Sequence, residues 1–124
     1  MLADSFKRAV ETGDHGGILA CLAEDVVFRS PIVFKPYHGR DAVAPILAAV
    51  TQVFEDFRYV DHLEGPASAT LLFQARVGDR ELDGLDYLRF GDDGLVSEFV
   101  VMVRPLSAAN ALAEAMRARL ESVA

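Results

Sequence analysis

The sequence has no tryptophan and only one cysteine, Cys21. A single cysteine cannot close an intramolecular disulfide, so no disulfide framework supports this fold. Cys21 lies within the apolar stretch 18–22. Because reactive thiols need an accessible, electropositive setting, we expect Cys21 to be a small buried side chain.

Long apolar runs are also missing. Even the apolar stretch at residues 42–53, which contains Pro45 and no charge, stays well short of the roughly 20 residues of a transmembrane helix. The first residues carry their charges within an amphipathic pattern, which is not typical of a signal peptide. We therefore expect a cytoplasmic protein that does not bind a membrane.

Basic residues are few, with 12 Lys and Arg against 19 Asp and Glu, and the formal net charge is −7. Because no basic cluster offsets this charge locally, nucleic acid is not an expected partner. The sequence contains no His-x-x-x-His, Cys-x-x-Cys or glycine-rich phosphate-binding motif. It therefore predicts neither a metal site nor a cofactor.

A chain of 124 residues with 52% hydrophobic residues can bury the core of one domain, so residues 1–124 form a single predicted domain. Apolar residues at helical spacing predict a first helix over Leu2–Val10, ended by Gly13. A second, short helix should follow Asp14 as its cap, and a third, capped by Asp41, should run to about Phe54.

An alternating pattern over Asp25–Ser30 predicts a first strand, which Pro31 and Pro36 bring to an end. Four more strands, separated by short glycine-containing turns, are expected at 57–64, 69–77, 81–90 and 95–104. Connections this short join only antiparallel neighbours, so these four strands form a meander. Leu112, Met116 and Leu120 predict a final helix after Pro105.

Several segments together resemble the SnoaL-like branch of the nuclear transport factor 2-like superfamily, over nearly the whole chain. They are Thr12-Gly13-Asp14, the strand and turn at 25–31, Gly39, the segment 84–90, the Asp93-Gly94 turn and the segment 101–106. The chain is most similar to the small stand-alone bacterial proteins of this superfamily.

The resemblance implies an α+β fold of the nuclear transport factor 2-like or cystatin-like type, a cone-shaped roll. In this roll a curved antiparallel sheet wraps three N-terminal helices, a C-terminal helix follows, and the open end of the cone is a pocket. Relatives include polyketide cyclases, ketosteroid isomerase and limonene epoxide hydrolase, and also domains that bind partners without chemistry. The fold alone therefore does not decide the function.

Asp86 is the clearest candidate for a catalytic residue. It alternates with Leu82, Gly84, Leu88 and Phe90, so it should be the one charged residue on the apolar, concave side of its strand. An unpaired carboxylate in such a setting has a raised pKa, which suits a general base or acid near neutral pH. The alternative is a structural carboxylate paired with a cation or with backbone amides.

His38 and Tyr59 are further catalytic candidates. His38 lies in a loop expected near the mouth of the pocket, where an imidazole can transfer protons, although loop histidines are often merely solvated. The Tyr59 phenol can orient a carbonyl group, or it can simply pack against the sheet. Arg29, Glu98 and Arg104 are expected to form structural ion pairs.

The predicted ligand-binding residues share an expected position on the concave face or near its mouth. They are Phe28, Ser30, Phe34, Tyr37, Phe57, Leu88, Val100 and Met102. The opposite face of the last strand should then carry Phe99, Val101 and Val103, beside Leu85 and Tyr87. Because an apolar outer face is costly to leave in water, we expect a homodimer through the sheet.

Three functions fit these features. One is a cofactor-independent isomerase, cyclase or epoxide hydrolase that moves protons on a small hydrophobic molecule, with Asp86 as base or acid and Tyr59 and His38 assisting. Another is a protein that binds such a molecule without reaction. The last is a dimeric interaction domain whose pocket is collapsed.

Overall fold

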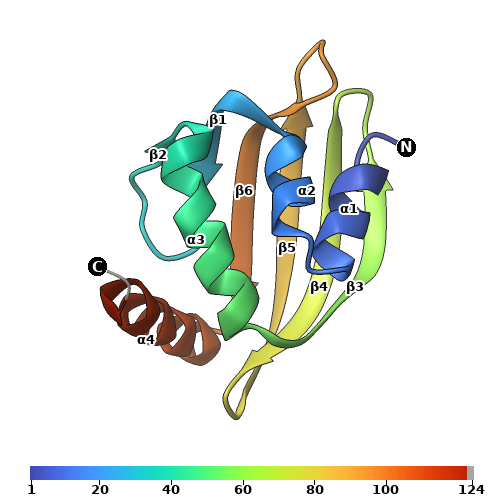
Figure 1. Ribbon diagram of the computed structural model, residues 1–124. Helices are drawn as coiled ribbons and strands as arrows, with labels where there is room; N and C mark the ends of the chain where they lie inside the picture. Colours follow the sequence, from blue (N-terminus) through green and yellow to red (C-terminus); the bar gives the residue numbers. More distant parts are fainter. Residues whose placement is uncertain (123–124) are drawn as a thin grey trace.

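The structure, a computed structural model, describes residues 1–122 as four helices and six strands (Figure 1). The elements in chain order are α1 (Asp4–Glu11), α2 (His15–Ala20), β1 (Leu22–Arg29), β2 (Tyr37–His38), α3 (Arg40–Val53), β3 (Glu55–Glu64), β4 (Ser68–Val77), β5 (Arg80–Phe90), β6 (Val96–Arg104) and α4 (Leu106–Ser122). The α+β class and the predicted order of helices and strands are confirmed. The short strand β2 was not expected.

One sheet of six strands holds the fold together, in the order β2-β1-β6-β5-β4-β3. Strands β3 to β6 form the predicted antiparallel meander, because each pairs with its neighbour in the chain. Strand β1 then adds to β6 in a parallel pairing, with α3 and the meander lying between these two strands in the sequence.

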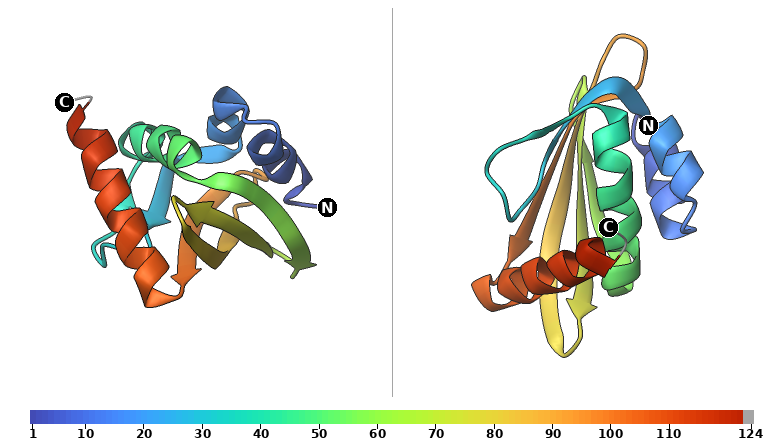
Figure 2. Two further views of the ribbon diagram at one scale, coloured as in Figure 1. Left: turned by 90° about the horizontal axis from the view of Figure 1, so that it is seen from below. Right: turned by 60° about the vertical axis from the view of Figure 1, so that its left-hand side comes forward.

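The helices α1, α2 and α3 cover one face of this sheet, and α4 crosses the end of the sheet where β6 finishes (Figure 2). The main core lies between the three helices and the sheet and includes Phe6, Leu22 and Leu71, each at most 1% exposed. Among residues 1–122, no helix is long and apolar enough to cross a membrane.

Short polar and glycine signals position the helices. Gly13 ends α1 with a φ of 69°, a left-handed conformation that a side chain disfavours. Asp14 then caps α2, since its Oδ1 accepts a hydrogen bond of 2.9 Å from the backbone N–H of Gly17. Helix α3 begins at Arg40, because Gly39 and not the predicted Asp41 is its N-cap residue.

The inward and outward faces of β6 differ from the sequence prediction. An irregularity in the pairing of β5 with β6, between Arg89 and Phe90, shifts the alternation by one residue. Consequently Val96 and Phe99 are both buried, whereas Met102 is 57% exposed. A one-residue bulge exchanges the two faces of a strand, so every residue beyond it faces opposite to the prediction.

The expectation that Val100 and Met102 line the pocket is therefore wrong, and so is the expectation that Phe99, Val101 and Val103 form the outer face. Asp86 lies directly opposite Val101 in the β5–β6 register, and both residues line the cavity described below. Arg29 and Glu98 form an ion pair of 2.9 Å as predicted, and Arg104 pairs with Asp83 at 2.7 Å.

Candidate functional site

A cavity of about 1170 Å³ lies between the inner face of the sheet and the helices. Its walls come from α1 and the α1–α2 turn, from α3, from strands β1 to β6, and from α4. Most lining residues are apolar, among them Ile46, Leu47, Val50 and Phe99. The volume exceeds the roughly 300–1,000 Å³ of typical small-molecule sites, so a sizeable apolar ligand can enter.

Asp86 brings a carboxylate into this apolar cavity. The alternation of β5 turns Asp86 inward together with Leu82 and Leu88, and the residue is only 6% exposed. Its Oδ2 accepts a hydrogen bond of 2.6 Å from the hydroxyl of Tyr59. Among residues 1–122, Oδ1 has no hydrogen-bond partner, so this oxygen is free to act on a ligand.

The ionisation of Asp86 is tuned to neutral pH. Burial raises the pKa of its carboxyl group from 3.8 to about 7, and the hydrogen bond from Tyr59 opposes part of this rise because it favours the charged form. Near neutral pH the side chain therefore exists in both forms. A group in this state can both accept and return a proton, as a general base and acid must.

Tyr59 holds Asp86 without lining the cavity itself. Its ring makes an edge contact with Phe57, with 5.0 Å between the ring centroids, and a second edge contact with Phe73 at 6.4 Å. Burial, and next the negative charge of Asp86, raise the pKa of the Tyr59 hydroxyl well above its ordinary value. The phenol thus stays protonated and keeps donating to Asp86.

An aromatic cluster of Phe54, Phe57 and Phe73 forms the wall beside this pair. Gly84 makes the cluster possible, because a Cβ atom at this position would lie 2.3 Å from Cζ of Phe73. The Phe73 ring therefore lies directly over the backbone of Gly84, two residues before Asp86. The rings line the cavity without filling it, which disfavours the collapsed-pocket interpretation.

The sequence matches the model of the SnoaL-like domain over residues 3–99. The chain belongs to the SnoaL-like family. No curated protein matches this SnoaL-like domain in sequence.

Two solved structures are similar to this SnoaL-like protein in both sequence and fold. A steroid delta-isomerase from Pseudomonas aeruginosa is 44% identical, with a TM-score of 0.94 over 98% of this chain and 90% of the other. The second structure is a protein from Silicibacter pomeroyi DSS-3 that is conserved in bacteria and has a cystatin-like fold. It is 38% identical, with a TM-score of 0.92 over 97% of this chain and 85% of the other.

A more distant structure, a putative ketosteroid isomerase from Kribbella flavida DSM 17836, is 24% identical, with a TM-score of 0.69 over 84% of this chain and 76% of the other. At this identity the likeness concerns the fold alone. Another solved structure, described as NTF2-like, shares this fold, and the protein from Silicibacter pomeroyi is described as having a cystatin-like fold.

Several of the predicted ligand-binding residues line the cavity of this SnoaL-like domain. They are Phe28, Ser30, Tyr37 and Phe57. Leu88 faces inward as predicted, but it is completely buried in the core and does not line the cavity. Asp86 and Tyr59, predicted separately as catalytic candidates, are in direct contact.

His38 lies outside this site. Tyr37 and His38 are consecutive in β2, so their side chains point to opposite faces, and Tyr37 is the one that lines the cavity. His38 is exposed and borders a shallow polar depression with Glu24, Asp25 and Asp93. The prediction that His38 assists catalysis beside Asp86 is therefore wrong.

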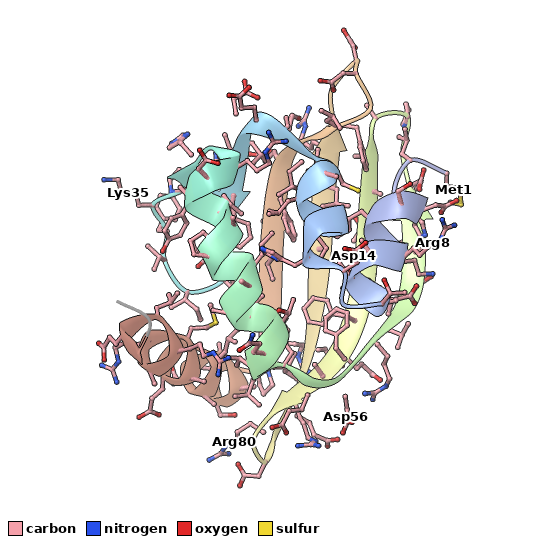
Figure 3. All side chains as sticks on the ribbon, in the orientation of Figure 1. Met1, Arg8, Asp14, Lys35, Asp56 and Arg80 are labelled. Carbon is pink, nitrogen blue, oxygen red and sulfur yellow. The ribbon has the colours of Figure 1, made fainter. Side chains whose placement is uncertain are left out.

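Phe34 is likewise not a wall of the cavity, because it is 97% exposed. It lies between β1 and β2 on a loop at the periphery, where its neighbour Lys35 projects outward (Figure 3). The first residues of this loop, 30–33, line the cavity, but Phe34 does not. The hydrophobicity of Phe34 suggested burial, so its expected place in the pocket wall is wrong.

Helix α4 supplies cavity residues that the sequence interpretation did not assign to the site. Leu112, Met116 and Leu120 follow one another at a spacing of four, and all three line the cavity. Arg117 and Glu114 lie at the exposed rim. The apolar stripe of α4 was visible in the sequence, but only tertiary packing shows that it closes the cavity.

Another cluster of ionisable groups lies apart from the cavity, where α1 meets β3. Ligand atoms of Asp4, His62 and Glu64 lie within 4.8 Å of one another, and among residues 1–122 this is the one group of such side chains close enough to hold a metal ion. Glu64, however, accepts hydrogen bonds from the backbone N–H groups of Leu2 and Ala3 and contacts His62 at 2.7 Å. Its carboxylate thus already fixes the start of α1.

Proposed function

We propose that this protein is a cofactor-independent isomerase that moves a carbon–carbon double bond in a small hydrophobic ketone, with Asp86 carrying the proton. The observation that supports it most is a carboxyl group with a pKa of about 7 at the wall of a large apolar cavity. The similarity to a steroid delta-isomerase over 98% of this chain adds to this support.

The chemistry follows from the two forms of Asp86. As a carboxylate it takes a proton from the carbon next to the carbonyl group of a β,γ-unsaturated ketone, and the electrons of the broken C–H bond delocalise onto the carbonyl oxygen. As a carboxylic acid it then returns the proton to the far end of the resulting dienolate, so the double bond becomes conjugated. One proton moves within the substrate, and no oxidation state changes overall.

Tyr59 has a positioning role in this proposal. Its hydrogen bond to Oδ2 fixes the carboxyl group and leaves Oδ1 toward the ligand. Because Tyr59 does not line the cavity, it acts on the substrate only through Asp86. The apolar walls exclude water from the dienolate and favour an uncharged substrate.

The test uses 5-androstene-3,17-dione, a β,γ-unsaturated ketone whose isomerisation creates a conjugated chromophore that ultraviolet absorption detects. We expect the wild type to catalyse this change and Asp86→Asn to lose roughly 10²–10⁴-fold in rate, the range of general acid–base catalysis. Asp83→Asn, an outward-facing carboxylate of the same strand, is the matched control and should retain full activity.

Binding is measured in parallel by thermal shift. Equal binding of the steroid by wild type and Asp86→Asn, with no conversion by either, would show a binding protein instead of an isomerase. If Asp86→Asn converts the steroid as fast as the wild type, Asp86 does not carry the proton.

A further inference from the structure

Ser30 has a hydroxyl group whose hydrogen-bonding direction is fixed by the local backbone. Its Oγ accepts hydrogen bonds of 3.0 Å from the backbone N–H groups of both Ile32 and Val33. A serine hydroxyl has two acceptor lone pairs and one O–H donor. Since both lone pairs are occupied, the remaining capacity of this group is to donate its proton.

That proton has no acceptor among the residues that the structure describes. Within residues 1–122, the two bonds from Ile32 and Val33 are the hydrogen bonds that Ser30 Oγ makes, and Ser30 lines the cavity. Donation from two N–H groups also polarises the hydroxyl, because hydrogen bonds in a chain strengthen one another. Ser30 therefore offers the cavity a polarised donor that a ligand acceptor can use.

Other cavity hydroxyls lack this fixed direction. Thr12 and Thr51 both donate to backbone carbonyl groups of their own helical turns, to Arg8 and Ala48 respectively. Tyr37 also lines the cavity, and a tyrosine hydroxyl can either donate or accept. Among these cavity hydroxyls, that of Ser30 is thus the one whose bonds to the backbone leave it only the role of a donor.

Ser30 directly follows the last residue of β1, at the edge of the part of the sheet that contains Asp86. Arg29 pairs with Val100 in the parallel β1–β6 ladder, so the next residue, Ser30, comes beside Val101. Val101 in turn lies opposite Asp86 on β5. Two strand spacings, about 10 Å, separate β1 from β5 across β6, and Ser30, Val101 and Asp86 all line the cavity.

We propose that Ser30 binds the carbonyl oxygen of the substrate by donating its hydroxyl proton, and so orients a ketone with its reactive carbon toward Asp86. This inference rests on the proposed isomerase function for the nature of the ligand. It identifies the substrate class as molecules with a hydrogen-bond acceptor a short distance from the carbon that exchanges its proton. Negative charge that develops on the carbonyl oxygen strengthens this bond, so Ser30 stabilises the dienolate.

The test compares the binding of 4-androsten-3-one with that of the same steroid lacking the 3-oxo group, by calorimetry on the full chain. We expect Ser30→Ala to weaken binding of the ketone about three- to tenfold, the value of one neutral hydrogen bond, and to leave binding of the deoxy steroid unchanged. In infrared spectra, the carbonyl stretch of the bound ketone should move to higher frequency in this variant.

Ser30→Asn replaces the donating hydroxyl by an amide but can keep the hydrogen bonds from the backbone. An asparagine side-chain oxygen can accept from the N–H groups of Ile32 and Val33 while its NH₂ group donates, so ketone binding should be largely restored. Ser97→Ala, which removes a hydroxyl bonded to the carbonyl of Arg89 and remote from the cavity, should change neither affinity.

Equal weakening of both steroids by Ser30→Ala would overturn the inference, and so would unchanged ketone binding or a wild type that binds neither steroid. Failure of the isomerase proposal gives a different result. In that case the wild type does not convert the β,γ-unsaturated steroid, while the dependence of ketone binding on Ser30 persists.

Discussion

Tyr59 on β3 reaches across the intervening strand β4 to donate a hydrogen bond of 2.6 Å to Asp86 on β5. Phe73 on β4 lies between these two strands, paired with Tyr59 on one side and with Gly84 on the other. Because Gly84 has no side chain, the Phe73 ring settles over it. The contact between Tyr59 and Asp86 thus depends on three adjacent strands and not on either residue alone.

Tyr59→Phe should shift the pH dependence of activity. The Tyr59 hydrogen bond favours the ionised form of Asp86, so the loss of this bond raises the pKa of Asp86 from its value of about 7. If Asp86 is the base, kcat/KM of the wild type rises with pH through about 7, and the rising limb of the variant lies at higher pH. A pH–rate profile measures this shift.

The control is Tyr87→Phe, which removes a hydroxyl from the outer face of β5. Its profile should coincide with that of the wild type. A Tyr59→Phe profile with lower amplitude and an unmoved limb would contradict the assigned effect of Tyr59 on the pKa of Asp86.

The pH dependence of stability provides a prediction that needs no substrate. The pKa of Asp86 is 3.8 in its ordinary setting and about 7 in the folded protein. As the pH rises between these values the unfolded chain loses this proton first, so the free energy of unfolding decreases. Asp86→Asn has no carboxyl group to ionise, so its free energy of unfolding lacks this decrease with pH. The asparagine can still accept the hydrogen bond from Tyr59.

The stability of Asp86→Asn relative to wild type should therefore increase from about pH 4 to about pH 7 and then stay constant. Each pKa unit corresponds to about 1.4 kcal/mol, so the full change is on the order of 4 kcal/mol. Urea unfolding of both proteins at a series of pH values measures it. A difference that does not vary with pH would mean that Asp86 ionises with an ordinary pKa.

Much of the fold could be predicted from the sequence because its local signals agree. The alternation of Leu82, Gly84 and Asp86 correctly assigned the inward face of β5, and short turns correctly predicted the meander. The parallel pairing of β1 with β6 joins segments about 70 residues apart, such as Phe28 and Phe99. No local pattern specifies such a long-range pair.

The candidate site was predicted only in part. Asp86, Tyr59 and four of the cavity residues were named, but the β6 irregularity reversed the faces of Val100 and Met102. Such a bulge depends on how β6 fits against β5, so alternation within one strand does not predict it. Similarly, whether Tyr37 or His38 faces the cavity depends on the pairing of β2 with β1.

The outer face of the sheet suggests an association that size measurements can test. Leu72, Leu85 and Met102 form one row across β4, β5 and β6, and Tyr87 lies beside Val100 in the next row. An apolar row in the middle of a sheet is costly in water, so we expect a second copy of the chain to cover it.

Met102→Glu should convert the protein from a dimer to a monomer, since the new charge would be buried at the centre of this contact. Leu106→Glu is the control, because Leu106 is an even more exposed apolar residue, at 75%, and lies in α4 outside the sheet. Analytical ultracentrifugation at micromolar concentration measures both. A wild type that sediments as a monomer would refute the expected dimer.

Gly84→Ala should destabilise the protein through its contact with Phe73. The added Cβ atom would lie 2.3 Å from Cζ of the ring, so the ring must move, and overpacking of this kind costs about 1–3 kcal/mol. In the Phe73→Leu background the smaller side chain leaves room for the Cβ atom, so the same substitution should cost less. Urea unfolding of the two single variants and the double variant measures this coupling.

Gly16→Ala is the matched glycine control, since its Cβ atom would meet nothing closer than Oδ1 of Asp14 at 3.7 Å and would lie in helix α2. This change should stabilise the protein by up to about 1 kcal/mol because alanine is the better helix former. If Gly84→Ala costs the same in both Phe73 backgrounds, the ring is not what requires glycine. If the two substitutions are coupled, Gly84 sets the position of the Phe73 ring. The Phe73 ring in turn sets the position of the Tyr59 ring, which packs against it.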